Sequence, residues 1–207
     1  MAIFDSLILG SSSPRREKFL LDLGVKIKKV KHYLDEHELM SEKYSFEENV
    51  KKISIAKNEY IYNSLDIENK THFILTADTL VWNSKLFFPK PRNQFEAKNM
   101  LKKLKNHTHF VTTAICLRKK ENYEVSYETT KVVMKDFSDK HLTNYINFND
   151  ILSKAGSYGI QDKKFNLVKS YSGCYNNVVG LPVCRLIKLF KKMEFRIYNE
   201  IVCDKHT

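Results

Sequence analysis

The amino-acid sequence predicts a protein of the α/β or α+β class that is built on a mixed sheet. Apolar runs typical of buried strands alternate with amphipathic segments typical of helices along the whole chain. The 207 residues are 43% hydrophobic and 12% aromatic, which is enough to close a core. Because no repeat, low-complexity tract or linker interrupts this order, we expect one domain over residues 1–207, with a C-terminal extension after about residue 193.

The first predicted elements are a strand over residues 7–9 and a helix that follows a serine-rich loop. Ser13 is a favourable N-cap, and Pro14 suits the first turn of a helix. Gly24 follows the apolar stripe of this helix and supplies the left-handed residue that commonly ends one.

The second helix and the strand after it each contain a charged residue within an apolar pattern. Ser45 and Glu48 form a capping box, and the stripe that follows at helical spacing includes Lys57. Residues 73–82 form a nearly continuous apolar run, typical of a buried strand, that contains Asp78. The later predicted elements are a helix after Asn93, strands over residues 110–117 and 123–134 joined as a hairpin, a helix after Ser138, loops and short strands over residues 155–179, and a helix from Pro182.

The charge balance favours polyanionic partners. Lysine and arginine exceed aspartate and glutamate by 35 to 24, a net charge of +11, although lysine clusters such as residues 26–29 are expected to be plain charged surface. No apolar run approaches the roughly 18 to 20 residues of a membrane span, and the first residues lack a secretory signal, so we expect a cytoplasmic protein. The four scattered cysteines predict buried thiols rather than disulfides or a zinc site.

Residues 11–16 carry the strongest local signal of function. A helix N-terminus offers free N–H groups and a positive dipole end to an anion. The hydroxyls of Ser11 and Ser13 add hydrogen-bonding groups, and Arg15 or Arg16 can hold phosphate oxygens. The segment thus predicts a phosphate-binding loop, and the alternative is an ordinary capped helix with two exposed arginines.

Lys57 and Asp78 both occupy positions where an unpaired charge is unfavourable. Lys57 lies on the apolar stripe of its helix, so we expect it to face a carboxylate or a phosphate, unless it extends to solvent at the edge of the stripe. Asp78 shares a strand face with apolar residues, so a metal ion, Lys57 or a reacting water is expected beside it, unless it caps the end of the strand.

Two further segments are candidates for ligand contacts. Asp35 and Glu36 belong to a small acidic group that suits Mg²⁺, although such a group is more often a solvated loop. Residues 154–161 place small residues beside a lysine and end at Gln161, whose amide suits the edge of a base.

Taken in order, these segments resemble the Maf family of nucleotide pyrophosphatases over about residues 6–190. The resemblance depends on Ser11-x-Ser13-Pro14-Arg15-Arg16, Asp35-Glu36, Ala56-Lys57, Ala77-Asp78-Thr79, Lys90-Pro91, Thr108-His109, Lys154-Ala155-Gly156-x-Tyr158-Gly159-Ile160-Gln161 and Val178-Val179-Gly180-Leu181-Pro182. It implies the elongated Maf/ITPase-like α/β fold, in which a curved mixed sheet and two lobes flank a nucleotide-binding cleft. Members often form homodimers.

The resemblance also implies roles for individual residues. Asp78 corresponds to the general base or metal-linked carboxylate, Glu36 to a second acidic group, and Lys57 and Lys90 to residues that stabilise phosphate charge. The substrate-binding residues that it implies are Ser11, Ser13, Arg15, Arg16, Thr79 and Gln161. One or two Mg²⁺ or Mn²⁺ ions are expected to bridge Asp78, Glu36 and the phosphates.

Within the family, Arg15, Thr79 and Gln161 resemble the branch that hydrolyses dTTP and UTP to the monophosphate and pyrophosphate. Thr76 and Pro89 depart from the family pattern, because each replaces a common glycine. The alternatives are the same chemistry on CTP or 7-methyl-GTP, and a basic nucleic-acid-binding or division-linked interaction protein. The second alternative lacks any recognised nucleic-acid-binding motif, so no nucleic-acid partner is expected.

Overall fold

The computed structural model describes residues 6–36, 38–84 and 86–197 of the chain. It contains a seven-stranded mixed sheet in the order β2-β1-β3-β5-β6-β7, with β4 paired to β3, and this confirms the predicted α/β class with a mixed sheet. The strands are β1 (Ser6–Leu9), β2 (Lys26–Lys29), β3 (Phe73–Trp82), β4 (Phe87–Phe88), β5 (Thr108–Lys119), β6 (Asn122–Met134) and β7 (Val168–Ser172). The helices are α1 (Pro14–Asp22), α2 (Phe46–Ser64), α3 (Gln94–Leu104), α4 (Asp139–Phe148), α5 (Tyr175–Val179) and α6 (Val183–Lys192), with short 3₁₀ turns η1 (Asn69–Thr71) and η2 (Ala155–Ser157).

The described chain divides into two compact units. The first contains the residues up to Asp78, Thr113–Glu128 and the segment from Gly180 onward. The second contains Thr79–Thr112 and Thr129–Val179. Strands β3, β5 and β6 each contribute residues to both units.

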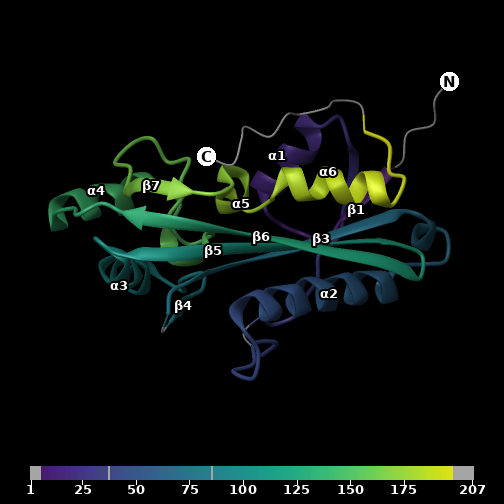
Figure 1. The fold of residues 1–207 in the computed structure, drawn as a ribbon, viewed down its shortest axis with the longest axis horizontal. Coiled ribbons are helices and arrows are strands. Elements are labelled where there is room, and N and C mark those ends of the chain that lie inside the picture. The colour runs from purple at the N-terminus through teal and green to yellow at the C-terminus, as the bar shows by residue number, and fades with distance from the viewer. Residues whose placement is uncertain (1–5, 37, 85, 198–207) are drawn as a thin grey trace. The chain divides into compact units, whose positions relative to one another are not determined.

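In the first unit, helices cover both faces of the sheet (Figure 1). Because successive side chains of a strand point to opposite faces, β1 and β3 supply two separate cores. Leu7 and Leu9 belong to the cluster formed with α1 and α6. Ile8 and Ile74 instead contact Ile61 of α2. The parallel register of β1 and β3 aligns these alternating residues, so the two faces stay distinct along both strands.

The first two helices begin where the capping residues predict. Both hydrogen bonds of the capping box at Ser45 and Glu48 are present at the start of α2. Ser13 is the N-cap residue of α1, but its side chain makes no capping hydrogen bond there. Gly24 follows α1 with a φ of 74°, in the left-handed region that favours glycine.

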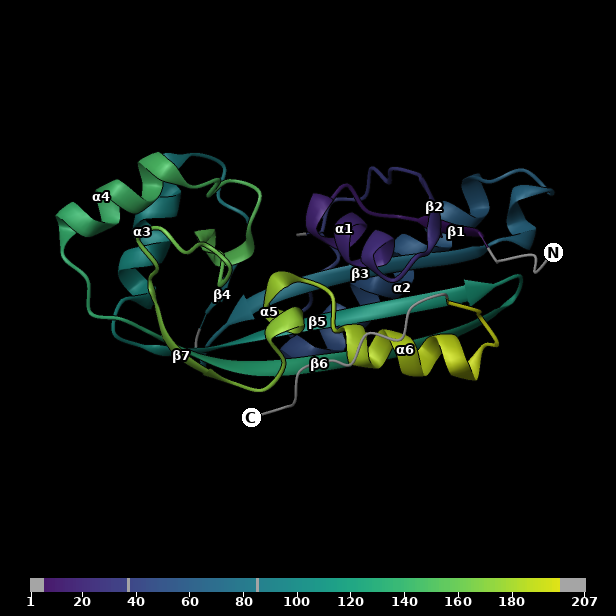
Figure 2. The same cartoon turned by 90° about the horizontal axis from the view of Figure 1, so that it is seen from above.

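In the second unit, α3 and α4 lie side by side (Figure 2). Asn93 and Ser138 accept hydrogen bonds from the third backbone N–H that follows each of them, as the predicted caps require. Leu101 and Tyr145 contribute buried side chains from the two helices to one hydrophobic cluster.

Several short elements were not predicted from the sequence. Strand β2 lies at an edge of the sheet and pairs in parallel with β1, yet three of its four side chains are exposed lysines. Its sequence therefore has the charged surface that was expected but no apolar signal of a strand. Lysines at such an edge also discourage pairing with other chains. Strand β4 and helix α5 have at most five residues each, too few for a clear periodic pattern. Strand β7 lies within residues 155–179, where short strands were predicted.

The cysteines and the C-terminal segment complete the fold. Cys116 and Cys174 are buried thiols, as predicted, but Cys184 is disulfide-bonded, so the expectation of free thiols is wrong at that position. Phe195 packs against Phe190 and Phe73 in the first core. Part of the segment expected as an extension therefore joins the core. The residues after 197 lie outside the described chain.

None of the helices in the described part of the chain has the length and hydropathy needed to cross a membrane.

Candidate functional site

The centre of the candidate site is an ion pair between helix α2 and strand β3. The Nζ atom of Lys57 lies 2.6 Å from Oδ1 of Asp78, and the two residues are only 2% and 4% exposed. The predicted positions explain the contact, because Lys57 lies on the buried stripe of α2 and Asp78 lies on the face of β3 that α2 covers. Each side chain thus supplies the partner that burial of the other requires.

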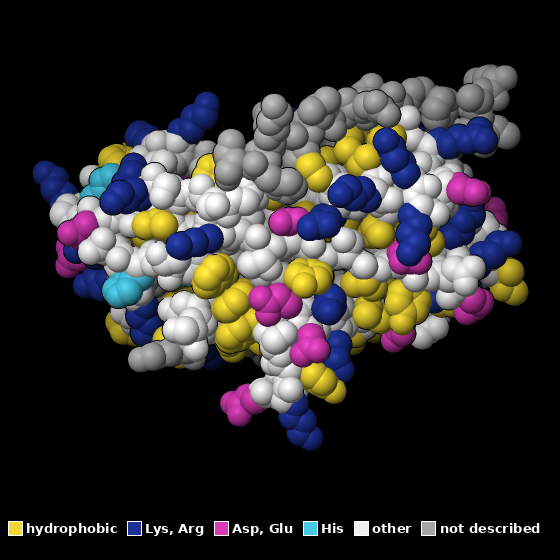
Figure 3. Space-filling view, in the orientation of Figure 1, with side chains coloured by type: hydrophobic (Ala, Val, Ile, Leu, Met, Phe, Trp, Pro, Cys, Tyr) yellow, Lys and Arg dark blue, Asp and Glu magenta, His cyan; other side chains and the backbone are white. Residues whose placement is uncertain are grey.

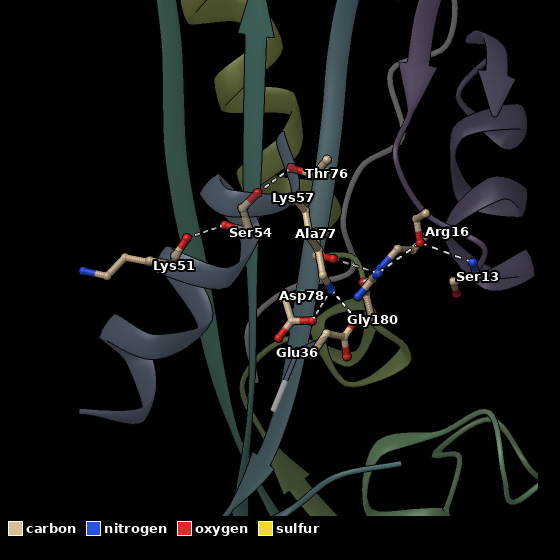
Figure 4. Close-up of polar contacts among 11 residues, drawn as sticks. Ser13, Arg16, Glu36, Lys51, Ser54, Lys57, Thr76, Ala77, Asp78 and Gly180 are labelled. Atoms are coloured by element: carbon tan, nitrogen blue, oxygen red, sulfur yellow. Dashed lines mark hydrogen bonds and ion pairs between the residues drawn. The ribbon is translucent and has the colours of Figure 1, made fainter. Parts of the chain in front are cut away.

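Glu36 adds a second carboxylate to this pair. Figure 4 shows Glu36 and Asp78 beside Lys57. The Oε1 atom of Glu36 lies 2.5 Å from Nζ of Lys57, and its side chain is 35% exposed, so solvent reaches the group. Asp35 is exposed, and His37 lies outside the described residues. Of the acidic group predicted around residue 36, Glu36 is the member that the structure brings to Lys57.

Hydrogen bonds to the backbone hold α2 against β3 on both sides of the ion pair. The hydroxyl of Thr76 donates to the carbonyl of Ser54 at 2.7 Å. The amide of Asn58 donates to the carbonyl of Ile74 at 3.1 Å. Thr76, one of the two departures from the family pattern, therefore bonds strand β3 to helix α2 two residues before Asp78.

The bulk of Thr76 is accommodated at Gly10, which lies on the neighbouring strand end. A Cβ atom at Gly10 would lie 2.6 Å from Cγ2 of Thr76, closer than such atoms approach one another. Position 76 thus carries a larger residue than the common glycine, and the space for it is left by the absence of a side chain at Gly10.

Arg16 connects the start of helix α1 to the strand that carries Asp78. Its Nε atom donates to the carbonyl of Gly180 at 2.8 Å, and its Nη1 atom donates to the carbonyl of Ala77 at 3.0 Å. Nη1 also lies 3.1 Å from the hydroxyl of Ser11. Burial lowers the pKa of Arg16 below its ordinary value, and the attraction of Asp78 and Glu36 opposes that shift.

These bonds change the interpretation of the predicted phosphate loop. Two of the carbonyl acceptors that hold Arg16 come from segments far from it in sequence, which no local pattern indicates. The hydroxyl of Ser11 also accepts from the backbone N–H of Ser13 at 3.2 Å, which shapes the loop before α1. Arg15 and Ser13 are partly exposed. The structure therefore places Ser11, Arg16 and Asp78 in one neighbourhood within the first unit.

The neighbourhood combines two carboxylates, Asp78 and Glu36, with two cations, Lys57 of α2 and Arg16 of the first turn of α1. Lys57 and Arg16 offset the negative charge of Asp78 and Glu36, so a triphosphate that approaches meets no net carboxylate repulsion. Oδ1 of Asp78 accepts a hydrogen bond from Lys57. Since both oxygens of a carboxylate can accept hydrogen bonds, Oδ2 is a further acceptor. The arrangement suits positioning and charge stabilisation of phosphate groups more than covalent chemistry.

Three of the predicted site residues belong to the second unit. Lys90 is exposed, whereas Thr79 and Gln161 are partly exposed. The carbonyl of Pro89, the other departure from the family pattern, accepts from the N–H of Gly156 at 3.2 Å. Gly156 has a φ of 68°, and a Cβ atom there would lie 3.0 Å from Val81, so the glycine is required at this contact.

The second unit also contains two polar groups whose surroundings sequence patterns did not reveal. Asp162 accepts bonds from Lys154 and Tyr145 in one cluster. His109 is fully buried, its Nε2 atom lies 2.6 Å from the hydroxyl of Tyr158, and burial lowers its pKa to about 4. Both depend on tertiary contacts.

The donor set of the first unit fits a divalent cation that is shared with a substrate. Mg²⁺ in nucleotide sites is commonly held by one or two carboxylates together with phosphate oxygens and water. Asp78 and Glu36 are two such carboxylates on one ammonium group. Across residues 6–36, 38–84 and 86–197, no group of three His, Cys, Asp or Glu side chains could hold a metal ion.

Comparisons with known proteins agree over most of the chain. The family model described as "Maf-like protein" matches residues 6–193. A dTTP/UTP pyrophosphatase of Caldicellulosiruptor bescii is 36% identical over 191 residues, which is 91% of this chain and 95% of that protein. A dTTP/UTP pyrophosphatase of Treponema denticola is 36% identical over 204 residues, with 92% and 98% of the two chains covered. Another, from Pelodictyon phaeoclathratiforme, is 37% identical over 187 residues, with 90% and 96% covered.

A solved structure of a HAM1 protein from Coxiella burnetii matches with a TM-score of 0.42 and 13% sequence identity, covering 65% of this chain and 75% of that chain.

Proposed function

Since the chain belongs to the Maf family, we propose that it is a nucleoside triphosphate pyrophosphatase that releases pyrophosphate and a nucleoside monophosphate. The observation that carries the proposal is the buried ion pair of Lys57 and Asp78, with Glu36 on the same ammonium group. A purely structural ion pair would not require a second, solvent-reached carboxylate at 2.5 Å from the same ammonium group.

The proposed reaction is attack of water on the α phosphorus with departure of pyrophosphate. A bond forms between the water oxygen and phosphorus, and the bond to the bridging oxygen between the α and β phosphorus atoms breaks. We assign Asp78 as the acceptor of the water's proton, through the oxygen that does not bond Lys57. Lys57 holds this carboxylate in place, and it adds positive charge where the triphosphate binds.

Arg16 supports the same site in two ways. Its bonds to the carbonyls of Ala77 and Gly180 hold the backbone next to Asp78. Its charge also stabilises phosphate groups at the start of α1, where the N-terminal dipole favours an anion. Ser11, Ser13 and Arg15 remain predicted phosphate contacts, and Lys90 remains a predicted charge stabiliser.

A divalent cation, Mg²⁺ or Mn²⁺, is proposed as the cofactor. Asp78 and Glu36 are the residues that would hold it, together with oxygens of the substrate. When bound, such an ion supplies charge neutralisation on the triphosphate and its leaving group.

The preferred substrate is proposed to be a pyrimidine triphosphate, dTTP or UTP. The relatives that carry this name cover at least 90% of this chain, and Arg15, Thr79 and Gln161 match the pattern of that branch. A homodimer and a cytoplasmic location remain predictions.

A panel of triphosphates tests the proposal. The purified protein is mixed with dTTP, UTP, CTP, GTP or 7-methyl-GTP, with Mg²⁺, Mn²⁺ or a chelator, and released pyrophosphate is measured. We expect release from dTTP and UTP that is at least about tenfold faster than from the others and that the chelator abolishes. Preference for CTP or 7-methyl-GTP would correct the substrate, and no release from any nucleotide would refute the activity.

The alternative of a nucleic-acid-binding protein is tested in parallel by binding to duplex DNA and to RNA at several salt concentrations. Charge-driven binding would weaken steeply as salt rises. On the face drawn in Figure 3, lysine and arginine side chains are interspersed with acidic and hydrophobic ones. This distribution differs from the continuous basic stripe that such a partner favours.

A further inference from the structure

A tight turn in the second unit contains Gln161. The backbone N–H of Asp162 donates to the carbonyl of Gly159 at 3.1 Å, which closes the four residues from Gly159 to Asp162. Gln161 is the third residue of this turn and is partly exposed. The backbone position of Gln161 therefore depends on the contacts that hold Gly159 and Asp162, the first and last residues of the turn.

The carboxylate of Asp162 holds both ends together. Its Oδ2 atom accepts from the N–H of Gly159 at 3.1 Å, so the last side chain of the turn is bonded to its first residue. A Cβ atom at Gly159 would lie 2.8 Å from the same oxygen, which no ordinary contact permits. Glycine is therefore required for the carboxylate to fold back over the turn.

Two further side chains fix the carboxylate itself. Nζ of Lys154 lies 2.8 Å from Oδ1 and 2.6 Å from Oδ2 of Asp162. The hydroxyl of Tyr145 donates to Oδ2 at 2.5 Å and accepts from the N–H of Gly159 at 3.0 Å. Lys154 and Tyr145 are both buried, so the cluster exchanges little with water and is rigid.

We infer that Asp162, held by Lys154 and Tyr145, is a positioning residue for Gln161 and thereby sets the selectivity for the base of the nucleotide. The inference rests on the proposed function, and it extends that function to residues that do not touch the substrate. The support, with buried Lys154 and Tyr145, is thereby distinct from the partly exposed amide of Gln161, which is the group proposed to contact the base.

The chemistry of an amide explains why such a support matters. A glutamine side chain presents one oxygen acceptor and one nitrogen donor. Uracil presents an N3 donor beside an O4 acceptor, whereas cytosine presents an N3 acceptor beside an N4 donor. An amide free to rotate can pair with either base, so discrimination requires that Gln161 be held in one geometry.

The test compares Asp162→Asn with the wild-type protein. The ratio of kcat/KM for UTP to kcat/KM for CTP is expected to fall by at least about tenfold, chiefly through a higher KM for UTP, because misplacement of a contact weakens discrimination between substrates. Asp136→Asn is the matched control, since it removes an exposed carboxylate of the same unit that pairs with Lys105. This control should leave the ratio unchanged.

A double-mutant cycle separates positioning from plain structural support. In the background of Gln161→Ala, Asp162→Asn should change the selectivity ratio no further, because the group being positioned is absent. An unchanged ratio in the single variant, or an equal fall in both backgrounds, would overturn the inference. Should Asp162→Asn fail to fold, Tyr145→Phe is the variant that tests the inference. It keeps the ion pair between Lys154 and Asp162, and it is expected to lower the UTP to CTP selectivity ratio as well.

Hydrogen exchange, measured without nucleotide, distinguishes failure of the inference from failure of the proposed function. The amide of Gly159 should exchange at least about tenfold faster in Asp162→Asn, because it loses part of its bonding. Faster exchange with unchanged selectivity overturns the inference alone. Absence of pyrophosphate release by the wild-type protein, whatever the exchange rate, refutes the proposed function and the inference with it.

Discussion

Lys57 and Asp78 form an ion pair of 2.6 Å that joins helix α2 to strand β3 in the interior of the first unit. Taking two charges out of water is costly, and their mutual attraction repays that cost only where further hydrogen bonds satisfy both groups. Glu36 supplies one such bond to the ammonium group. We therefore expect the pair to add little to the net free energy of unfolding. Its main effect is to hold the carboxylate of Asp78 in one position.

Asp78→Asn should lower the rate of pyrophosphate release by about 10²- to 10⁴-fold, because an amide cannot accept the proton of the attacking water. The variant should remain folded, since its side-chain oxygen can still accept a bond from Lys57. Steady-state kinetics and circular dichroism measure the two effects. Asp22→Asn, which alters an exposed carboxylate paired with Lys18, is the control. Full activity in the Asp78 variant would remove that residue from the role of base.

Lys57→Met should lower the free energy of unfolding by about 3 to 5 kcal/mol, because it leaves the buried Asp78 carboxylate without its cation. The double variant Lys57→Met/Asp78→Leu should recover most of that loss while it stays inactive. Denaturant unfolding gives both free energies. A double variant no more stable than the single one would show that the loss comes from packing rather than from an unpaired charge.

Gly10→Ala should destabilise the first unit by about 1 to 3 kcal/mol, because the new methyl group would overlap Cγ2 of Thr76. Thr76 cannot rotate away without losing its bond to the carbonyl of Ser54. Thr76→Ser keeps the hydroxyl and removes Cγ2, so adding it to Gly10→Ala should restore stability. Thermal unfolding of the two single variants and the double variant checks this coupling, and simple additivity would contradict it.

The buried His109 should make stability depend on pH between about 4 and 6.5. Burial lowers its pKa to about 4 in the folded protein, while the unfolded chain keeps a value near 6.5. The unfolded state therefore binds more protons in this window, so stability is complete above about 6.5 and falls as the pH drops toward 4. The shift corresponds to at most about 3 kcal/mol.

The measurement is the free energy of unfolding from pH 4.5 to pH 7.5 for the wild-type protein and for His109→Leu. The difference between the two should grow in favour of the variant as the pH falls. A constant difference across this range would show that another group causes the acid sensitivity.

Local patterns were sufficient for the main elements of the fold. The capping box at Ser45, the caps at Asn93 and Ser138, and the apolar run of β3 each depend on residues within one or two helical turns. The same patterns marked Lys57 and Asp78, because a charge within an apolar stripe is anomalous by itself. By contrast, the exposed lysines of β2 concealed a strand that pairs in parallel with β1 and packs Ile27 against the first core.

The partners of Arg16 and Asp162 illustrate what local patterns do not contain. Arg16 was predicted to bind phosphate, yet in the structure it bonds the carbonyl of Gly180, 164 positions away in the chain. Asp162 follows the family-like segment and gave no signal, although it organises the turn of Gln161. Backbone carbonyls accept bonds from any side chain that the fold brings near, so neither relationship has a sequence signature.

The sequence by itself determined the alternation of strands and helices, the family, and the anomalous charges at Lys57 and Asp78, because periodicity, capping and burial costs act over neighbouring residues. Only the tertiary structure decided that these two charges pair with each other, that Glu36 joins them, and that Thr76 is accommodated at Gly10. These contacts join residues from different elements, and their geometry depends on the packing of a helix against a sheet rather than on the order of residues within either.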